Sequence, residues 1–98
     1  MKNEIILGAE GLGYKTTINK KEVDSCKEWI KRWVYPRKTI NTKRGSYNLK
    51  GLVEKEMSIY ISNGAFIKAA IEMGYKFKET SRESKNAYFN MSFNNLKG

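Results

Sequence analysis

The spacing of apolar residues changes along this chain, and that change limits the folds it can adopt. Three segments carry apolar residues at the spacing of a helix face, whereas the last quarter alternates apolar and polar residues at strand spacing. Of the 98 residues, 40% are apolar, which is enough to build one core. We therefore expect a single α+β domain over residues 1–98, with three helices and a C-terminal β-hairpin.

The first helix is predicted from its capping residues and its apolar face. Asn19 is a suitable N-cap, and Glu22 three residues later completes a capping box. Pro36 disfavours helical backbone at the residue before it, so the helix should end near Val34. We interpret its apolar face as core, formed by Val23, Cys26, Trp29, Ile30, Trp33 and Val34.

Two further helices should follow. The second is expected from about Tyr47 to Met57, with Ser46 as its N-cap. The third is expected from Asn63 to Met73, with Ser62 as its N-cap and Gly74 well placed to end it. Its expected exposed residues are few: Asn63, Gly64, Lys68 and Glu72.

Strand-like segments lie at both ends of the chain. Residues 75–79 and 88–93 alternate, so they predict a hairpin with a polar loop at 80–87 and with Phe89, Met91 and Phe93 facing the core. Residues 4–7 and 14–18 indicate a short N-terminal hairpin.

The N-terminal hairpin would turn through the glycine-rich residues 8–13. Their spacing matches neither G-x-G-x-x-G nor the P-loop, so we interpret them as a flexible turn rather than a phosphate site. At the other end of the chain, residues 94–98 should form a frayed tail.

Positive charge is concentrated in one stretch that has no acidic residue, from Trp29 to Val53. The chain has a formal charge of +9, and this stretch contributes +7 of it. Its basic residues are Lys31, Arg32, Arg37, Lys38, Lys43, Arg44 and Lys50. A concentrated positive field favours a polyanionic partner, most commonly nucleic acid, and we expect DNA rather than RNA.

The centre of this stretch, residues 35–46, is expected to be an extended basic loop punctuated by Pro36 and Gly45. Its hydroxyl and amide side chains suit phosphate and sugar contacts. A solvated linker with incidental charges is the alternative. Lys50 is the weakest candidate of the stretch, because Glu54 is spaced to pair with it on the same helix.

The element order resembles that of a winged helix-turn-helix domain. The resemblance implies that residues 63–73 would enter the major groove, with Asn63 and Lys68 as candidate contacts. It also implies that residues 75–93 would form the wing, with Arg82 and Lys85 at its tip. The third helix lacks Arg and Gln, so contacts with the nucleic-acid backbone should dominate.

A second resemblance is at the level of sequence and covers about residues 37–92. The chain is similar there to small uncharacterised proteins of phages and other bacterial mobile elements. The segments that carry this resemblance are residues 39–41, 46–50, 60–70 and 86–90. It implies a phage or mobile-element gene acting in the cytoplasm of a bacterial host. It also leaves open an alternative function, an anti-CRISPR-like inhibitor that binds a host defence nuclease or its nucleic-acid complex.

The composition argues against several other classes of protein. Histidine is absent, and the chain has one Cys and one Asp, so we expect no metal, no cofactor and no enzymatic activity. Ser46 with Lys50, and Ser81 with Lys85, have the spacing of a Ser–Lys pair, but such spacing arises by chance in a lysine-rich chain. No apolar run is long enough to span a membrane. The leading prediction is a non-enzymatic, basic nucleic-acid-binding protein.

Overall fold

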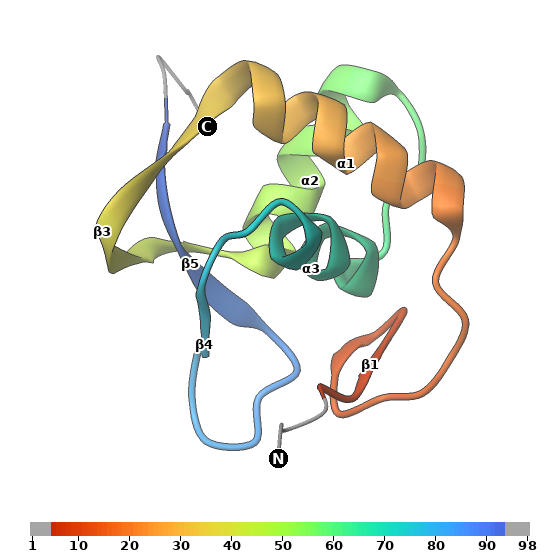
Figure 1. Cartoon of the computed structure of the whole chain (residues 1–98). Coiled ribbons are helices and arrows are strands. Elements are labelled where there is room, and N and C mark those ends of the chain that lie inside the picture. The colour runs from red at the N-terminus through yellow and green to blue at the C-terminus, as the bar shows by residue number, and fades with distance from the viewer. Residues whose placement is uncertain (1–4, 94–98) are drawn as a thin grey trace.

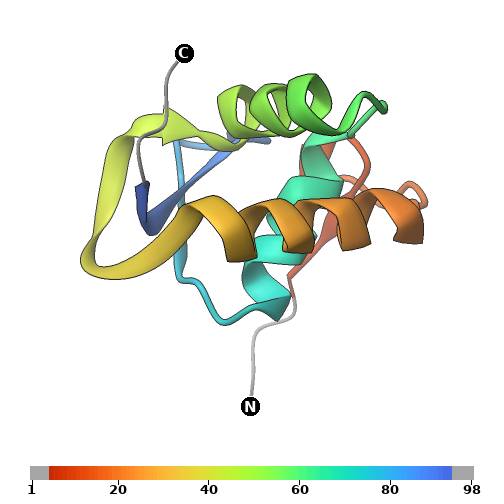
Figure 2. The same cartoon turned by 90° about the horizontal axis from the view of Figure 1, so that it is seen from above.

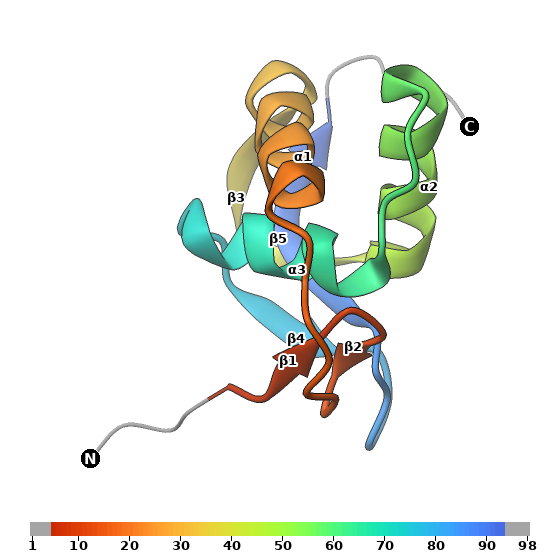
Figure 3. The same ribbon diagram turned by 90° about the vertical axis from the view of Figure 1, so that its right-hand side faces the viewer.

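Three helices form the α-helical part of the computed structural model, which describes residues 5–93, and two of them pack against the third. They are α1 (Lys20–Trp33), α2 (Ser46–Met57) and α3 (Asn63–Glu72). Figure 3 shows α3 crossing the lower ends of α1 and α2. The expected α+β fold with three helices is confirmed. The expected tail at residues 94–98 lies outside the described residues, as does the first residue of the expected strand at 4–7.

The predicted N-cap residues of α1 and α3 are confirmed, but the capping box of α1 is not, because the Glu22 carboxylate accepts the backbone N–H of Ser62 at 2.9 Å. Asn19 Oδ1 accepts a hydrogen bond from the backbone N–H of Glu22 at 3.2 Å. Ser62 Oγ accepts one from the backbone N–H of Ala65 at 3.1 Å. Gly74 follows α3 with a φ of +93°, a left-handed conformation that favours glycine at the end of a helix.

The predicted N-cap of α2 was wrong. Gly45 occupies the N-cap position, and no side chain caps this helix. Ser46 lies inside the first turn, where its buried Oγ accepts a hydrogen bond from the backbone N–H of Ala87 at 3.1 Å. The hydroxyl joins α2 to the sheet, which is a tertiary contact that local spacing does not reveal.

The predicted C-terminal hairpin is confirmed, and it belongs to a larger sheet. Strands β4 (Phe77–Glu79) and β5 (Ala87–Phe93) pair in antiparallel fashion. A third strand, β3 (Val34–Gly45), pairs with the other side of β5 and gives the strand order β3-β5-β4. The expectation of a loop at 35–46 was therefore wrong. Pro36 is tolerated because β3 is an edge strand, where a missing backbone N–H removes no essential bond.

The N-terminal hairpin is shorter than expected and shifted in sequence. Its strands are β1 (Leu7–Gly8) and β2 (Gly11–Leu12), within the glycine-rich stretch, and residues 14–18 form no strand. The hairpin packs against α3, where the backbone N–H of Gly64 donates to Ala9 O at 2.9 Å. A Cβ on Gly64 would lie 1.8 Å from Gly8 O, so only glycine permits this approach.

The core lies between the three helices and β5. Trp29, Phe66 and Phe89 are buried and meet edge to face, with ring centroids 6.1 and 5.7 Å apart. Met91 is also buried, and Phe93 is partly buried, as the alternating pattern predicted. Cys26 belongs to this core, and its burial, with a smaller effect of Glu22, raises the pKa of its thiol to about 12.

Candidate nucleic-acid interface

Strand β3 bulges away from β5 at two places. Between the pairs Pro36–Met91 and Asn41–Phe89, β3 advances five residues while β5 advances two. Between Asn41–Phe89 and Gly45–Tyr88, it advances four residues while β5 advances one. The first bulge is residues 37–40 and the second is residues 42–44, and together we call them the basic bulges. In Figures 1 and 2, β3 swings out at the left edge of the molecule.

The basic bulges contain the four central cations of the acid-free stretch: Arg37, Lys38, Lys43 and Arg44. The side chains of the first three residues are exposed, and that of Arg44 is half-buried. None of the four forms an ion pair within residues 5–93. Arg37 Nη2 donates to Thr39 Oγ1 at 2.9 Å, and Arg44 Nη1 donates to Asn48 Oδ1 at 2.9 Å. Both partners are neutral, so both guanidinium groups keep their full charge for an external anion.

Two asparagine side chains fix the bulges to the rest of the sheet. Asn90, on β5, donates to the backbone carbonyl of Arg37 at 3.0 Å and accepts from the backbone N–H of Lys76 at 2.7 Å. Asn41 donates to Met91 O at 2.9 Å and accepts from the backbone N–H of Lys43 at 3.0 Å. Backbone groups that the bulges leave unpaired are thus satisfied by amides, which gives the cations a defined scaffold.

The two candidates on α1 differ from each other. Lys31 is exposed and forms no ion pair within the part of the chain that the structure describes. Arg32 Nη1 lies 3.0 Å from Glu56 Oε2 on α2, so its charge is partly compensated. The Arg32 side chain is mostly exposed and that of Glu56 is about one third exposed, so solvent weakens this pair.

Lys50 forms the predicted pair with Glu54, at 3.1 Å. Its side chain is only 12% exposed, and Glu54 also accepts the backbone N–H of Ile61 at 3.0 Å. The Lys50 ammonium lies over two tyrosine rings, 5.0 Å from the centroid of Tyr47 and 5.2 Å from that of Tyr60. Lys50 therefore belongs to a local cluster and is less available to a phosphate than the exposed cations of β3.

The expectation that Asn63 is exposed was wrong, because the N-terminal hairpin covers it. Its side chain is 6% exposed, and Nδ2 donates to Glu10 O at 2.9 Å, to Asn86 Oδ1 at 2.9 Å and to Lys85 O at 3.3 Å. Gly64 is buried for the same reason. Asn63 thus joins the hairpin to the β4–β5 loop and presents no free edge to a base.

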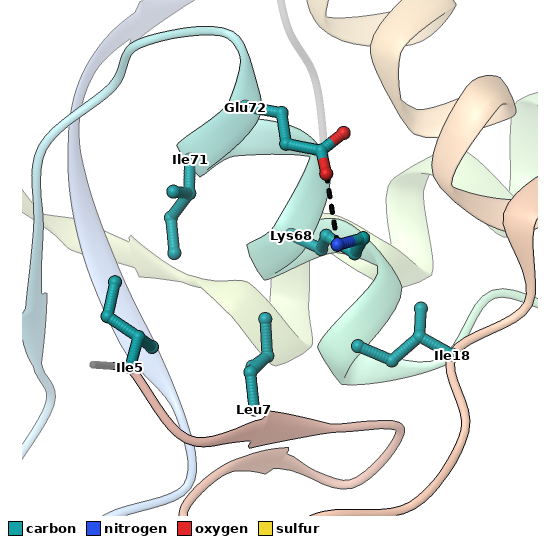
Figure 4. Close-up of a pocket in the computed structure, with 6 residues that line it drawn as sticks. All are labelled: Ile5, Leu7, Ile18, Lys68, Ile71 and Glu72. Carbon is teal, nitrogen blue, oxygen red and sulfur yellow. Dashed lines mark ion pairs between the residues drawn. The ribbon is translucent and has the colours of Figure 1, made fainter.

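Lys68 lies at the rim of a groove between α3 and the N-terminal segment (Figure 4). The groove is lined by Ile5, Leu7, Ile18, Lys68, Ile71 and Glu72. Lys68 pairs with Glu72 at 3.0 Å, and Glu72 also pairs with Lys27 on α1 at 2.7 Å. Two hydrogen bonds lower the pKa of the Glu72 carboxyl, with the larger effect from Lys27 and the smaller from Lys68. The charge of Lys68 is therefore compensated by an acidic residue of the same helix.

Arg82 and Lys85 lie in the loop between β4 and β5, as the sequence indicated, and both side chains are exposed. Neither forms an ion pair within the described ranges. The backbone of Lys85 is fixed, since its carbonyl accepts the backbone N–H of Leu12 at 2.9 Å. Arg82 is thus available to a phosphate, whereas the charge of Lys85 is partly offset by the carboxylate of Glu10.

Sequence reasoning missed several residues that shape these surfaces. The amide of Asn41 was expected to contact phosphate or sugar, whereas the structure uses it within the sheet. Asn90 was overlooked, because an asparagine in a strand has no local signature of a bulge. Tyr47 and Tyr60 were treated as ordinary helix and loop residues, yet they are 62% and 67% exposed. Exposed aromatic residues beside a basic stretch are a signal for nucleic-acid contact that could have been used.

Comparison of the chain with protein-family models, with curated proteins and with solved structures finds no match. Within residues 5–93, no helix combines the length and apolarity needed to cross a membrane. In the same part of the chain, no group of three or more Cys, Asp or Glu side chains is placed to hold a metal ion.

Proposed function

We propose that this protein binds nucleic acid without enzymatic activity, mainly through phosphate contacts made by the basic bulges of β3. The observation that carries the proposal is the placement of four cations, none of them ion-paired within the described residues, on two bulges of one edge strand. Bulges direct side chains away from the ladder, and an edge strand leaves one side open to a partner.

The electrostatics of this edge support a polyanion. Lys31 precedes β3 at the end of α1, so five cations without an ion pair in the described structure lie close together in sequence. The nearest acidic residues in sequence are Glu28 and Glu54, and Glu54 is already bound by Lys50. Arg and Lys in such an arrangement bind phosphates and release condensed counterions, which drives association.

The arrangement of elements supports a winged-helix-like mode in part. The helices and strands follow the order α1, β3, α2, α3, β4, β5, with β5 between β3 and β4. In winged helix-turn-helix proteins the helix before the wing enters the major groove. Here the N-terminal hairpin covers the start of α3, so we propose contacts with the nucleic-acid backbone through β3, with Arg82 and Lys85 as secondary contacts.

The test is a comparison of two variants with the same loss of charge. In the first, Arg37, Lys38, Lys43 and Arg44 are all replaced by Gln. In the second, the exposed lysines Lys15, Lys21, Lys76 and Lys78 are replaced by Gln. At low salt we expect the first variant to bind duplex DNA on the order of 100-fold more weakly than the second. Equal affinities of the two variants would mean that net charge alone, and not the basic bulges, governs binding.

A pull-down from bacterial lysate separates this function from the inhibitor hypothesis. We expect partners that are lost on treatment with nuclease, and loss on DNase rather than RNase would identify DNA. A host nuclease that is retained after both treatments would favour the anti-CRISPR-like alternative instead.

A further inference from the structure

A cavity of about 310 Å³ lies where α2, the start of α3, the N-terminal hairpin and the β4–β5 loop meet. It is lined by Ala9, Glu10, Tyr47, Lys50, Tyr60, Asn63 and Lys85. Asn63 holds its walls together, because its amide bonds both the hairpin and the β4–β5 loop. The cavity is open to solvent, and its walls come from the N-terminal hairpin, α2, the segment that leads into α3 and the β4–β5 loop.

Two exposed aromatic rings flank this cavity. Tyr47 and Tyr60 are among the most exposed large apolar residues, whereas aromatic rings of this size are usually at least partly buried. Lys50 lies over both rings, which limits their motion by cation–π attraction. Each ring is thus held beside the cavity with much of its surface open to solvent, as a stacking surface requires.

The charges around the cavity nearly balance. Lys50 is bound by Glu54, and Lys85 is opposed by Glu10, the one carboxylate of the lining. A hydrogen bond from Thr16, a backbone hydrogen bond and the charge of Lys85 lower the pKa of the Glu10 carboxyl, so that carboxyl is ionised at neutral pH. A small polyanion is therefore a poor ligand. A flat aromatic group joined to a singly charged phosphate fits better, because the rings can supply most of the binding.

We propose that Tyr47 and Tyr60 form a stacking site for unpaired bases of a single-stranded nucleic acid. This inference rests on the proposed function, because the basic bulges would hold the phosphate chain from which these bases extend. Bases inside a duplex are already stacked on their neighbours, whereas unpaired bases have free faces for aromatic side chains. The site therefore gives a preference for single-stranded segments that the charges of β3 alone do not give.

The experiment measures the binding of three labelled probes of about 12 nucleotides each, a length within single-strand site sizes. They are single-stranded DNA, single-stranded RNA of the same sequence, and the DNA duplex. The test variant carries Tyr47→Leu and Tyr60→Leu, and a rescue variant carries Tyr47→Phe and Tyr60→Phe. Tyr14→Leu is the matched control, since Tyr14 is exposed and lies outside the cavity lining.

We expect the double Leu variant to bind single strands at least about fivefold more weakly, with little change for the duplex, and the Phe variant to bind like wild type. Such a loss for either single-stranded probe supports the stacking site. Unchanged single-strand affinity in the Leu variant, or an equal loss for the duplex, overturns the stacking site. If wild type binds none of the probes at low salt, the proposed function itself fails.

Discussion

The side-chain amide of Asn90 donates a hydrogen bond to the backbone carbonyl of Arg37 across 3.0 Å, and this contact ties the first basic bulge to β5. The same amide accepts the backbone N–H of Lys76, so one buried side chain joins β5 both to β3 and to the residue that precedes β4. A buried hydrogen bond within the sheet therefore fixes the backbone of the first basic bulge.

Replacement of Asn90 by Ala should reduce stability. The change leaves the carbonyl of Arg37 and the N–H of Lys76 without their partner in a partly buried place, which costs about 1–3 kcal/mol. The free energy of unfolding in urea measures this loss. Thr17→Ala is the control, since Thr17 is exposed and should change stability by no more than about 0.5 kcal/mol. Equal effects of the two changes would contradict a structural role for Asn90.

Two glycine substitutions should act in opposite directions. A Cβ at Gly64 would lie 1.8 Å from Gly8 O, so Gly64→Ala must displace the N-terminal hairpin and should cost about 3 kcal/mol or more. Gly51, inside α2, has open space around its Cβ position, so Gly51→Ala should stabilise the protein by about 0.5–1 kcal/mol. Thermal and urea unfolding measure both values. A tolerated alanine at position 64 would mean that the hairpin does not pack on α3.

The helices could be predicted from sequence because their signals are local. Asn19 and Ser62 lie next to the residues they cap, and the apolar spacing defines each buried face within a few turns. The strand β3 could not be predicted in this way. Its exposed, polar sequence has no alternating pattern, and its pairing with β5 joins residues about fifty positions apart.

Only the basic residues of the candidate site could be predicted, because charge can be read directly from the sequence. Arg37, Lys38, Lys43 and Arg44 were identified because no acidic residue lies near them in sequence. The burial of Asn63 could not be foreseen, since it depends on a hairpin about fifty residues earlier in the chain. The missing information was that the N-terminal hairpin covers the start of α3.

The buried thiol of Cys26 should be unreactive in the folded protein. Its pKa is raised to about 12, so almost no thiolate exists at pH 8, and the side chain is inaccessible. A thiol reagent should therefore modify the native protein only as fast as it unfolds, and should modify it at once in denaturant. Rapid modification of the native protein would contradict the packing of α1.

The same raised pKa makes stability depend on pH. The fold favours the neutral thiol, so this contribution is fully present below the unfolded pKa near 9 and is lost as pH rises from about 9 toward 12. Between pH 9 and 10, wild type should lose more unfolding free energy than Cys26→Ala, by roughly 1 kcal/mol. Parallel losses in the two proteins would show that Cys26 is not buried as described.

The most direct test of phosphate binding by the basic bulges is the salt dependence of duplex DNA binding. Five engaged phosphates give a slope of log affinity against log salt of about −4.5 for wild type. Replacement of Arg37, Lys38, Lys43 and Arg44 by Gln should reduce this slope to about −1, while the four control lysine changes should leave it unchanged. A flat salt dependence in wild type, or an unchanged slope in the variant of the bulges, would contradict the proposal that β3 binds the phosphates.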